Sequence, residues 1–145
     1  MKKALITGIN GQDGSYLTEF LLEKGYEVHG ILKRNSVAEN QTARLDDYYS
    51  AIKDNLYYAD MTDMASLIRV LQEVQPDEIY NLAAQSHVRI SFDQPIYTTQ
   101  SVAVGTMNLL ESMRLICPKA KMYQASSSEM FGNNIDEDGY QRETT

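Results

Sequence analysis

The sequence has a single cysteine and comparatively few basic residues. Because Cys117 is the only cysteine among 145 residues, the chain can form neither an internal disulfide nor a cluster of thiolate metal ligands. The chain carries 13 Lys and Arg against 20 Asp and Glu, for a net charge of −7. This balance argues against a surface for nucleic acids or anionic membranes, since such surfaces are basic. We therefore expect no metal site and no nucleic-acid or membrane partner.

Long hydrophobic runs are also absent. The apolar runs are too short to span a bilayer, and a predicted strand begins at Lys3, which leaves no room for a signal peptide. No internal repeat or interdomain linker divides the sequence. We therefore expect a cytoplasmic protein with one domain that is large enough to bury a core.

A glycine-rich stretch near the N-terminus is the most informative feature that is present. The apolar residues 3–7 predict a buried strand, and residues 15–22 have helical spacing. Gly8 permits a tight turn, Gly11 a close approach of the backbone to a pyrophosphate, and Gly14 the packing of the helix on the sheet. The pyrophosphate would lie at the helix N-terminus, which favours an anion. Although the spacing is G-x-x-G-x-x-G, this context predicts dinucleotide binding in preference to a structural turn.

The end of the second predicted strand, residues 26–32, distinguishes NADP from NAD. NAD sites usually carry Asp or Glu about 20 residues after the glycines, whereas no carboxylate lies between Val28 and Ser36. Arg34 lies at this distance, within Lys33-Arg34-Asn35-Ser36, and its planar guanidinium suits a phosphate group. The sequence therefore predicts NADP; the alternative is a solvated surface loop.

Three further strands are predicted, over residues 55–58, 78–82 and 121–126. Ligands bind outside the carboxyl ends of such strands. Asp60, after the first of them, is suited both to accepting from an adenine amine and to starting the next helix. After the second, Ala83 and Ala84 leave room for the ribose and nicotinamide, and we interpret His87 as a structural hydrogen-bonding residue rather than a catalytic one.

Two further helices are predicted to cover the sheet. The first follows a cap at Thr62 or Asp63. Its apolar face comprises Leu67, Ile68, Val70, Leu71 and Val74. The second runs from about Tyr97 to Ile116. The side chains expected to reach the core are Val102, Met107, Leu109, Leu110, Met113 and Ile116. Residues 37–54 are expected to form a long connection with one helical turn near residues 43–49.

The fifth predicted strand leads into Ser127-Ser128-Glu129. A serine at this edge of the sheet can hydrogen-bond a substrate hydroxyl or carbonyl, and Glu129 can act as a general base. A serine turn that caps the next segment is an equally good interpretation.

Four stretches together resemble the extended short-chain dehydrogenase/reductase family and, within it, the GDP-mannose 4,6-dehydratases. They are residues 4–17, 28–31, 75–88 and 123–132. The glycine motif and Asn-Leu-Ala-Ala are shared by sugar-nucleotide epimerases and dehydratases, whereas Gly-Gln-Asp-Gly, His-Gly-Ile and Gln-Ala-Ser-x-Ser-Glu are more particular to the GDP-mannose enzymes. The resemblance covers nearly the whole chain. It implies an α/β fold with a Rossmann-type, doubly wound parallel sheet in the order 3-2-1-4-5.

The resemblance also implies a redox-neutral lyase that holds NADP. Hydride leaves C4 of the mannose, a base removes the C5 proton, the C6 hydroxyl leaves as water, and hydride returns to C6 to give GDP-4-keto-6-deoxymannose, a precursor of GDP-fucose. Glu129 matches the base and C6 proton donor. Ser127, where the family more often has Thr, matches the residue that bonds the C4 oxygen. Family members form dimers or tetramers, and residues 35–47 match the loop that reaches a neighbouring subunit.

The glycine spacing and the resemblance together predict the cofactor contacts. They are Gly8, Asn10, Gly11, Gln12, Asp13, Gly14, Lys33, Arg34, Asn35, Ser36, Asp60, Met61, Leu82, Ala83, Ala84, Gln85, Ser86 and Tyr97.

The family's Tyr-x-x-x-Lys pair lies downstream of the Ser-x-Glu motif, and in that region of this sequence Tyr140 is followed four residues later by Thr144. The family's sixth strand and sugar-nucleotide domain are also missing. We therefore interpret residues 1–145 as an incomplete NADP-binding Rossmann domain without a second domain, matching about the first two-fifths of such an enzyme. One alternative is an NAD-dependent nucleotide-sugar epimerase or dehydratase of the same family, which Lys33-Arg34 disfavours. Another is a non-catalytic dinucleotide-binding module, which the missing Tyr/Lys pair supports.

The purified 145-residue chain is predicted to have no dehydratase activity, because it lacks the Tyr/Lys pair. The measurement is formation of the 4-keto sugar from GDP-mannose and NADP⁺, and turnover would contradict the prediction. Mixing the chain with a full-length enzyme of the family tests the alternative of a non-catalytic module. If that alternative is correct, the added chain should alter the activity of the full-length enzyme.

Overall fold

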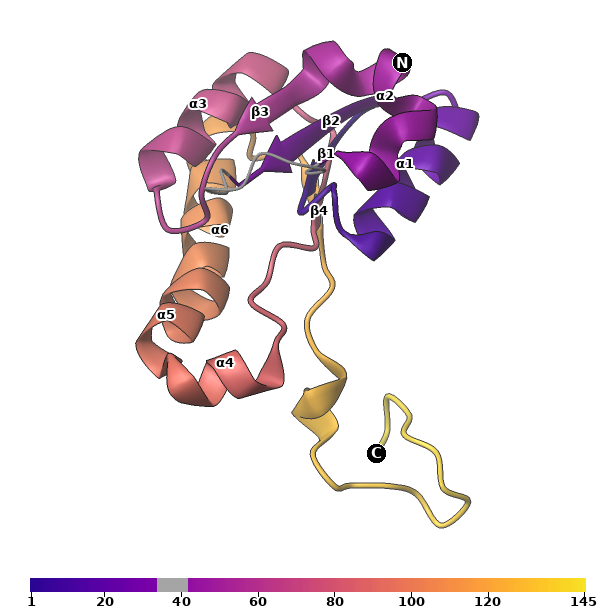
Figure 1. Cartoon of the computed structure of the whole chain (residues 1–145), viewed down its shortest axis with the longest axis vertical. Helices are drawn as coiled ribbons and strands as arrows, with labels where there is room; N and C mark the ends of the chain where they lie inside the picture. Colours follow the sequence, from indigo (N-terminus) through magenta and orange to yellow (C-terminus); the bar gives the residue numbers. More distant parts are fainter. Residues whose placement is uncertain (34–41) are drawn as a thin grey trace.

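The computed structural model describes residues 1–33 and 42–145 and is organised around one parallel five-stranded sheet (Figure 1). The strand order is β3-β2-β1-β4-β5, which confirms the predicted topology. The strands are β1 (Lys3–Thr7), β2 (Glu27–Leu32), β3 (Leu56–Tyr58), β4 (Glu78–Asn81) and β5 (Lys121–Gln124).

Strand β1 lies at the centre of the sheet and pairs with β2 on one side and β4 on the other. Its residues Ala4, Leu5 and Ile6 are fully buried, because both faces of the sheet are covered. The chain leaves β1 and β4 toward opposite faces, so a crevice opens between their carboxyl ends. Such a switch point is where open α/β sheets bind ligands.

Short and long helices cover the two faces (Figure 1). One face carries α1 (Gln12–Glu23), η1 (Ala43–Tyr48), α2 (Tyr49–Ile52) and η2 (Lys53–Asn55). The other carries α3 (Met64–Val74) and α6 (Gly105–Ile116), preceded by α4 (Val88–Asp93), α5 (Pro95–Thr99) and the π-helical turn η3 (Gln100–Val104). Residues 43–55 are thus more helical than the single turn predicted. No helix within the described ranges is both long and apolar enough to cross a membrane.

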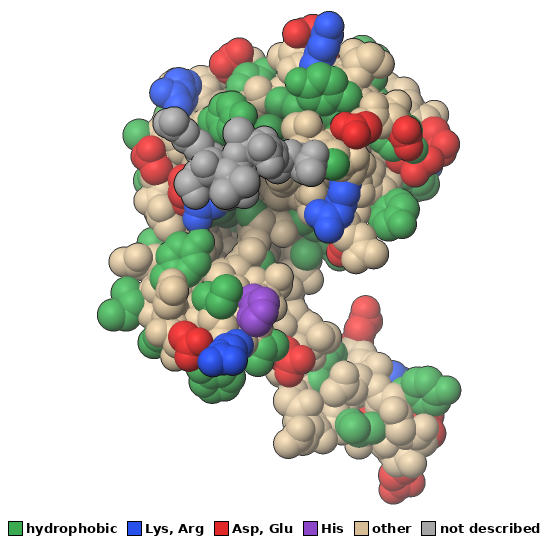
Figure 2. Space-filling model, in the orientation of Figure 1, with side chains coloured by type: hydrophobic (Ala, Val, Ile, Leu, Met, Phe, Trp, Pro, Cys, Tyr) green, Lys and Arg blue, Asp and Glu red, His purple; other side chains and the backbone are tan. Residues whose placement is uncertain are grey.

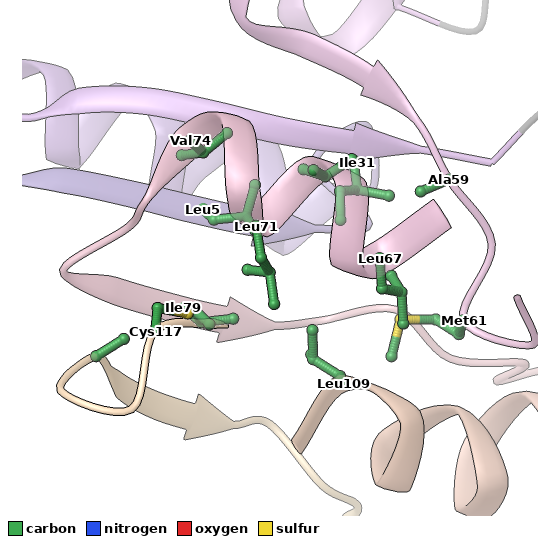
Figure 3. Packing of buried hydrophobic residues seen from close by; sticks show 12 residues of the cluster. Leu5, Ile31, Ala59, Met61, Leu67, Leu71, Val74, Ile79, Leu109 and Cys117 are labelled. Atoms are coloured by element: carbon green, nitrogen blue, oxygen red, sulfur yellow. The ribbon is translucent and has the colours of Figure 1, made fainter. Parts of the chain in front are cut away.

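Each face of the sheet has its own hydrophobic cluster. Figure 3 shows the cluster under α3, where Leu67, Leu71 and Val74 lie against Leu5 and Ile79. The other cluster lies under α1 and α2 and includes Ile6, Ile9, Leu21, Leu45 and Ile52. The face predicted for α3 is confirmed, except that Ile68 is only half-buried.

The core positions predicted for the last long helix are partly wrong. Leu109 is fully buried, but Val102, Met107 and Leu110 are 38%, 65% and 43% exposed. The buried stripe of α6 is narrow and contains the small residues Gly105 and Ser112, which let the helix lie close to its neighbours. Within the described residues nothing covers the wider apolar face of this helix.

Of the two residues predicted to cap α3, Thr62 and Asp63, the structure identifies Asp63 as the N-cap. Its Oδ1 accepts hydrogen bonds from the backbone N–H groups of Ala65 at 3.1 Å and Ser66 at 3.4 Å. Replacing a capping Asp by Ala typically costs about 1 kcal/mol.

Asp63→Ala is therefore expected to lower the free energy of unfolding by about 1 kcal/mol, because two N–H groups of the first turn lose their acceptor. Urea denaturation of the whole chain measures the change. Asp63→Asn is the matched control, since Asn is an equally good cap. Equal losses in both variants, or none in Asp63→Ala, would contradict the assignment.

Candidate functional site

A cavity of about 620 Å³ opens at the carboxyl edge of the sheet. Its size lies within the range of small-molecule sites, roughly 300–1,000 Å³. The space-filling view shows the surface hollowed between the sheet and the α4–α5 segment (Figure 2). The turn after β1 and the segments after β2, β3, β4 and β5 all reach this cavity, and α5 contributes Tyr97.

The cavity brings together every described residue that was predicted to contact the cofactor. These are Gly8, Asn10, Gly11, Gln12, Asp13, Gly14, Lys33, Asp60, Met61, Leu82, Ala83, Ala84, Gln85, Ser86 and Tyr97. The predicted residues Arg34, Asn35 and Ser36 lie outside the described part of the chain.

Five cavity residues were missed by the sequence analysis. They are Ile31, Ala59, Ser101, Ala125 and Ser126. Ile31, Ala59 and Ala125 lie at or just after strand ends, so the rule that selected Asp60 and Ala83 could also have selected them. Ser101 follows Tyr97 by one helical turn. Its hydroxyl is buried, without a hydrogen-bond partner of good geometry within the described residues.

The turn after β1 is held by close backbone contacts. Gly8 has a φ of +68°, and its carbonyl accepts from the N–H of Gly11 at 2.9 Å. A Cβ on Gly14 would lie 2.5 Å from the Gly8 oxygen and 2.6 Å from the Ile9 oxygen. Helix α1 begins at Gln12, inside the glycine stretch. Gly14 therefore lets the first turn of α1 lie against the β1 turn itself, not against the sheet as predicted.

The N-terminus of α1 is suited to an anion. Its N-cap is Gly11, which has no side chain to accept from the first N–H groups, and Gln12 and Asp13 line the cavity. Uncapped N–H groups and the positive end of the helix dipole favour a phosphate at such a place. A pyrophosphate therefore fits here in both space and polarity.

Lys33 links the end of β2 to α5 and to the segment after β3. Its ammonium donates a hydrogen bond to the Tyr97 hydroxyl at 2.7 Å and lies 3.6 Å from an Asp60 carboxylate oxygen. The hydrogen bond to Tyr97 and the charge of Asp60 raise the pKa of Lys33, against the effect of partial burial. The hydrogen bond from Lys33 lowers the pKa of Tyr97. A fixed positive charge thus stands at the cavity.

Asp60 shapes the turn between β3 and α3. Its Oδ1 accepts from the N–H of Thr62 at 2.9 Å and from the Thr62 hydroxyl at 2.8 Å. Burial acts to raise the pKa of Asp60, but the hydrogen bonds from Thr62 and the charge of Lys33 outweigh it, so the pKa is lowered. The second carboxylate oxygen lies beside Lys33. The cap of α3 is Asp63, so Asp60 is not the residue that starts this helix.

The segment after β4 is fastened at both ends. The N–H groups of Leu82 and Ala83 donate to the Thr7 hydroxyl, each at 3.1 Å. Gln85 donates to the Thr98 hydroxyl at 3.2 Å and accepts from the N–H of His87 at 2.7 Å.

The His87 ring is exposed and forms no hydrogen bond within the described residues. The prediction that its side chain is a structural hydrogen-bonding group is therefore wrong. No metal-binding group of His, Cys, Asp or Glu occurs in residues 1–33 and 42–145.

Ser127 and Glu129 do not line the cavity. Both are exposed, and Ser127 is the N-cap of η4 (Ser128–Phe131), where its hydroxyl accepts from the N–H of Glu129 at 3.1 Å. This contact is the serine turn that the sequence left as an alternative. Figure 1 shows the chain after β5 running away from the sheet. Ser126, which lines the cavity, precedes the pair and has a φ of +61°.

Comparison with known proteins gives a consistent picture of the family. Residues 5–145 match the family model described as GDP-mannose 4,6 dehydratase. The GDP-mannose 4,6-dehydratase of Yersinia enterocolitica is 53% identical over 152 residues, which cover 100% of this chain and 40% of that protein. The human GDP-mannose 4,6 dehydratase is 52% identical over 137 residues, or 89% of this chain and 36% of that protein. The chain thus spans about two-fifths of the length of such relatives.

Solved structures share the fold at lower identity. The UDP-Glc/GlcNAc 4-epimerase of Campylobacter jejuni superposes with a TM-score of 0.78 at 22% identity, over 91% of this chain and 39% of that chain. The UDP-glucose 4-epimerase of Bifidobacterium longum, solved in complex with NAD⁺ and UDP, gives 0.77 at 25% identity, over 90% and 38%.

Tyr97→Phe is expected to lower the pKa of Lys33, because the ammonium loses its hydroxyl acceptor. The pKa of Lys33 is raised by folding, so its contribution to stability is present at neutral pH and is lost as the pH rises through the folded-state pKa. The stability difference between wild type and Tyr97→Phe should therefore shrink in strong alkali. NMR titration of the Lys33 side chain measures the pKa. Tyr49→Phe is the control, and an unchanged Lys33 pKa in Tyr97→Phe would refute the coupling.

Proposed function

The chain belongs to the GDP-mannose 4,6-dehydratase family, and we propose that it is the part of such an enzyme that binds NADP and carries a serine–glutamate pair of the active site. The reaction proposed for the whole protein is the dehydration of GDP-mannose to GDP-4-keto-6-deoxymannose. The observation that carries the proposal is the cavity at the switch point of the sheet. The cavity lies at the uncapped N-terminus of α1 and is lined by the described residues that the sequence predicts to contact the cofactor.

The chain's own residues would hold each part of the dinucleotide. The glycine turn and the first N–H groups of α1 bind the pyrophosphate. Lys33 supplies positive charge for a 2′-phosphate, together with Arg34, which lies outside the described residues. Asp60, Ala83 and Ala84 line the cavity. Asp60 would accept from the adenine amine, and Ala83 with Ala84 would leave space for the ribose and nicotinamide. When bound, NADP supplies the acceptor and later the donor of a hydride.

Ser127 and Glu129 would act on the sugar. The Ser127 hydroxyl holds the C4 oxygen, and the Glu129 carboxylate takes the C5 proton and returns a proton to the departing C6 hydroxyl. In the structure the Ser127 hydroxyl accepts from the N–H of Glu129, and both residues lie outside the cavity. The proposal therefore requires the segment after Ser126 to turn toward the cavity.

A non-catalytic dinucleotide-binding module is the second candidate. The placement of Ser127 and Glu129 outside the cavity favours it. An NAD-dependent enzyme of the same family is less well supported, because Lys33, a cation, lies at the end of β2.

We also propose that the whole protein is a cytoplasmic homo-oligomer, a dimer or tetramer. The exposed side chains of Phe92, Ile96 and Met107 support further protein contacts on α4–α6.

Calorimetric titration of the chain with NADP⁺ and with NAD⁺ tests the cofactor. NADP⁺ is expected to bind at least about tenfold more tightly, a difference of about 1.4 kcal/mol. Lys33→Met should weaken NADP⁺ binding and leave NAD⁺ binding nearly unchanged, because only NADP⁺ carries the 2′-phosphate. Lys24→Met, which removes a cation at the far end of α1, is the matched control. Tighter binding of NAD⁺ would move the assignment to the NAD-dependent alternative, and binding of neither would remove the cofactor role of this chain.

A further inference from the structure

Three polar side chains form a hydrogen-bonded row across β1, β4 and the edge strand β5, at the carboxyl ends of these strands. The Thr7 hydroxyl donates to Asn81 Oδ1 at 2.6 Å, and Asn81 Nδ2 donates to Gln124 Oε1 at 2.7 Å. Thr7 and Asn81 are paired in register in β1 and β4, as are Asn81 and Gln124 in β4 and β5. Thr7 and Asn81 are only 0% and 1% exposed. The row therefore ties together the carboxyl ends of three strands.

The direction of every hydrogen bond in this row is set by the backbone. The N–H groups of Leu82 and Ala83 both donate to the Thr7 hydroxyl oxygen, so the hydroxyl hydrogen goes to Asn81. Asn81 thus presents its carbonyl oxygen to Thr7 and its NH₂ group to Gln124. Gln124 consequently takes part as an acceptor, through its side-chain oxygen.

Each member of the row comes immediately before a segment of the site. Thr7 precedes the glycine turn, and Asn81 precedes the segment that begins at Leu82. Gln124 is the last residue of β5 and precedes Ala125 and Ser126, which line the cavity.

The chain after Gln124 turns sharply and needs a firm anchor. Ser126 has a φ of +61°, a left-handed conformation that is strained for a residue with a side chain. Such a conformation persists only where its surroundings hold it. The anchors on its N-terminal side are the Gln124 side chain and the N–H of Ala125, which donates to the Asn81 carbonyl at 3.2 Å.

We propose that Gln124 is a positioning residue for the Ser127–Glu129 segment, acting as a hydrogen-bond acceptor for Asn81. Its oxygen holds the end of β5 in register with β4 and so sets the direction in which the chain leaves the sheet. The inference rests on the proposed function, because the roles of Ser127 and Glu129 belong to that proposal. Because Asn81 donates to position 124, this position requires a side chain that accepts a hydrogen bond. An apolar side chain of the same length cannot replace it.

Amide hydrogen exchange of the 145-residue chain, measured by NMR without cofactor, tests this role. Gln124→Met keeps the length of the side chain and removes the acceptor. It is expected to speed exchange of the Ala125 and Glu129 amides by about fivefold, the effect of losing one hydrogen bond. The separate variant Gln124→Glu keeps an acceptor, so its amide exchange rates should stay within about twofold of the wild-type rates. Gln72→Met is the matched control, on the exposed side of α3.

Unchanged exchange at Ala125 and Glu129 in Gln124→Met would overturn the proposal. Equal acceleration in Gln124→Met and Gln124→Glu would show that packing and not acceptance matters, and uniform acceleration across β1 and α3 would show a general structural role. Both results would also overturn it. These rates are measured without NADP⁺, so a failure of NADP⁺ binding in wild type counts against the proposed function alone.

Discussion

Helix α1 lies so close to the turn after β1 that a Cβ at Gly14 would stand 2.5 Å from the carbonyl oxygen of Gly8. This approach places the uncapped N-terminus of α1 directly over the end of the central strand. Because β1 is hydrogen-bonded on both sides, the turn is anchored at the middle of the sheet. The position of the cavity follows from this contact, since the N–H groups of the helix face the crevice at the switch point.

The same edge of the sheet is organised by polar side chains that the core would otherwise exclude. Thr7 and Asn81 are buried, and the side-chain oxygen and nitrogen of Asn81 each form a hydrogen bond along the row to Gln124. A satisfied polar row of this kind fixes one arrangement, because any slip in register would leave buried donors and acceptors unpaired. The three strand ends therefore keep a constant relation to one another at the edge of the sheet where the cavity opens.

Charge at the cavity is distributed over three elements. Lys33, which follows β2, contacts Tyr97 from α5 and Asp60 from the β3–α3 turn, so one cation joins parts that are far apart in the sequence. The hydrogen bond to Tyr97 and the charge of Asp60 keep Lys33 protonated, which suits a site for an anionic cofactor. The Ser127–Glu129 segment is outside this arrangement and is connected to it through the end of β5.

Local patterns in the sequence determined the five strands, the glycine turn, the start of α3 at Thr62 or Asp63, and the residues at the strand ends that line the cavity. These features depend on neighbours along the chain, such as the alternation of apolar runs with Gly, Asp and small residues. Only the tertiary structure decided that Val102, Met107 and Leu110 stay exposed, that the Ser127 hydroxyl caps a turn, and that Thr7, Asn81 and Gln124 form one row. Helical spacing shows which side chains share a face, but what covers that face, and which polar groups meet across strands, depends on segments distant in sequence.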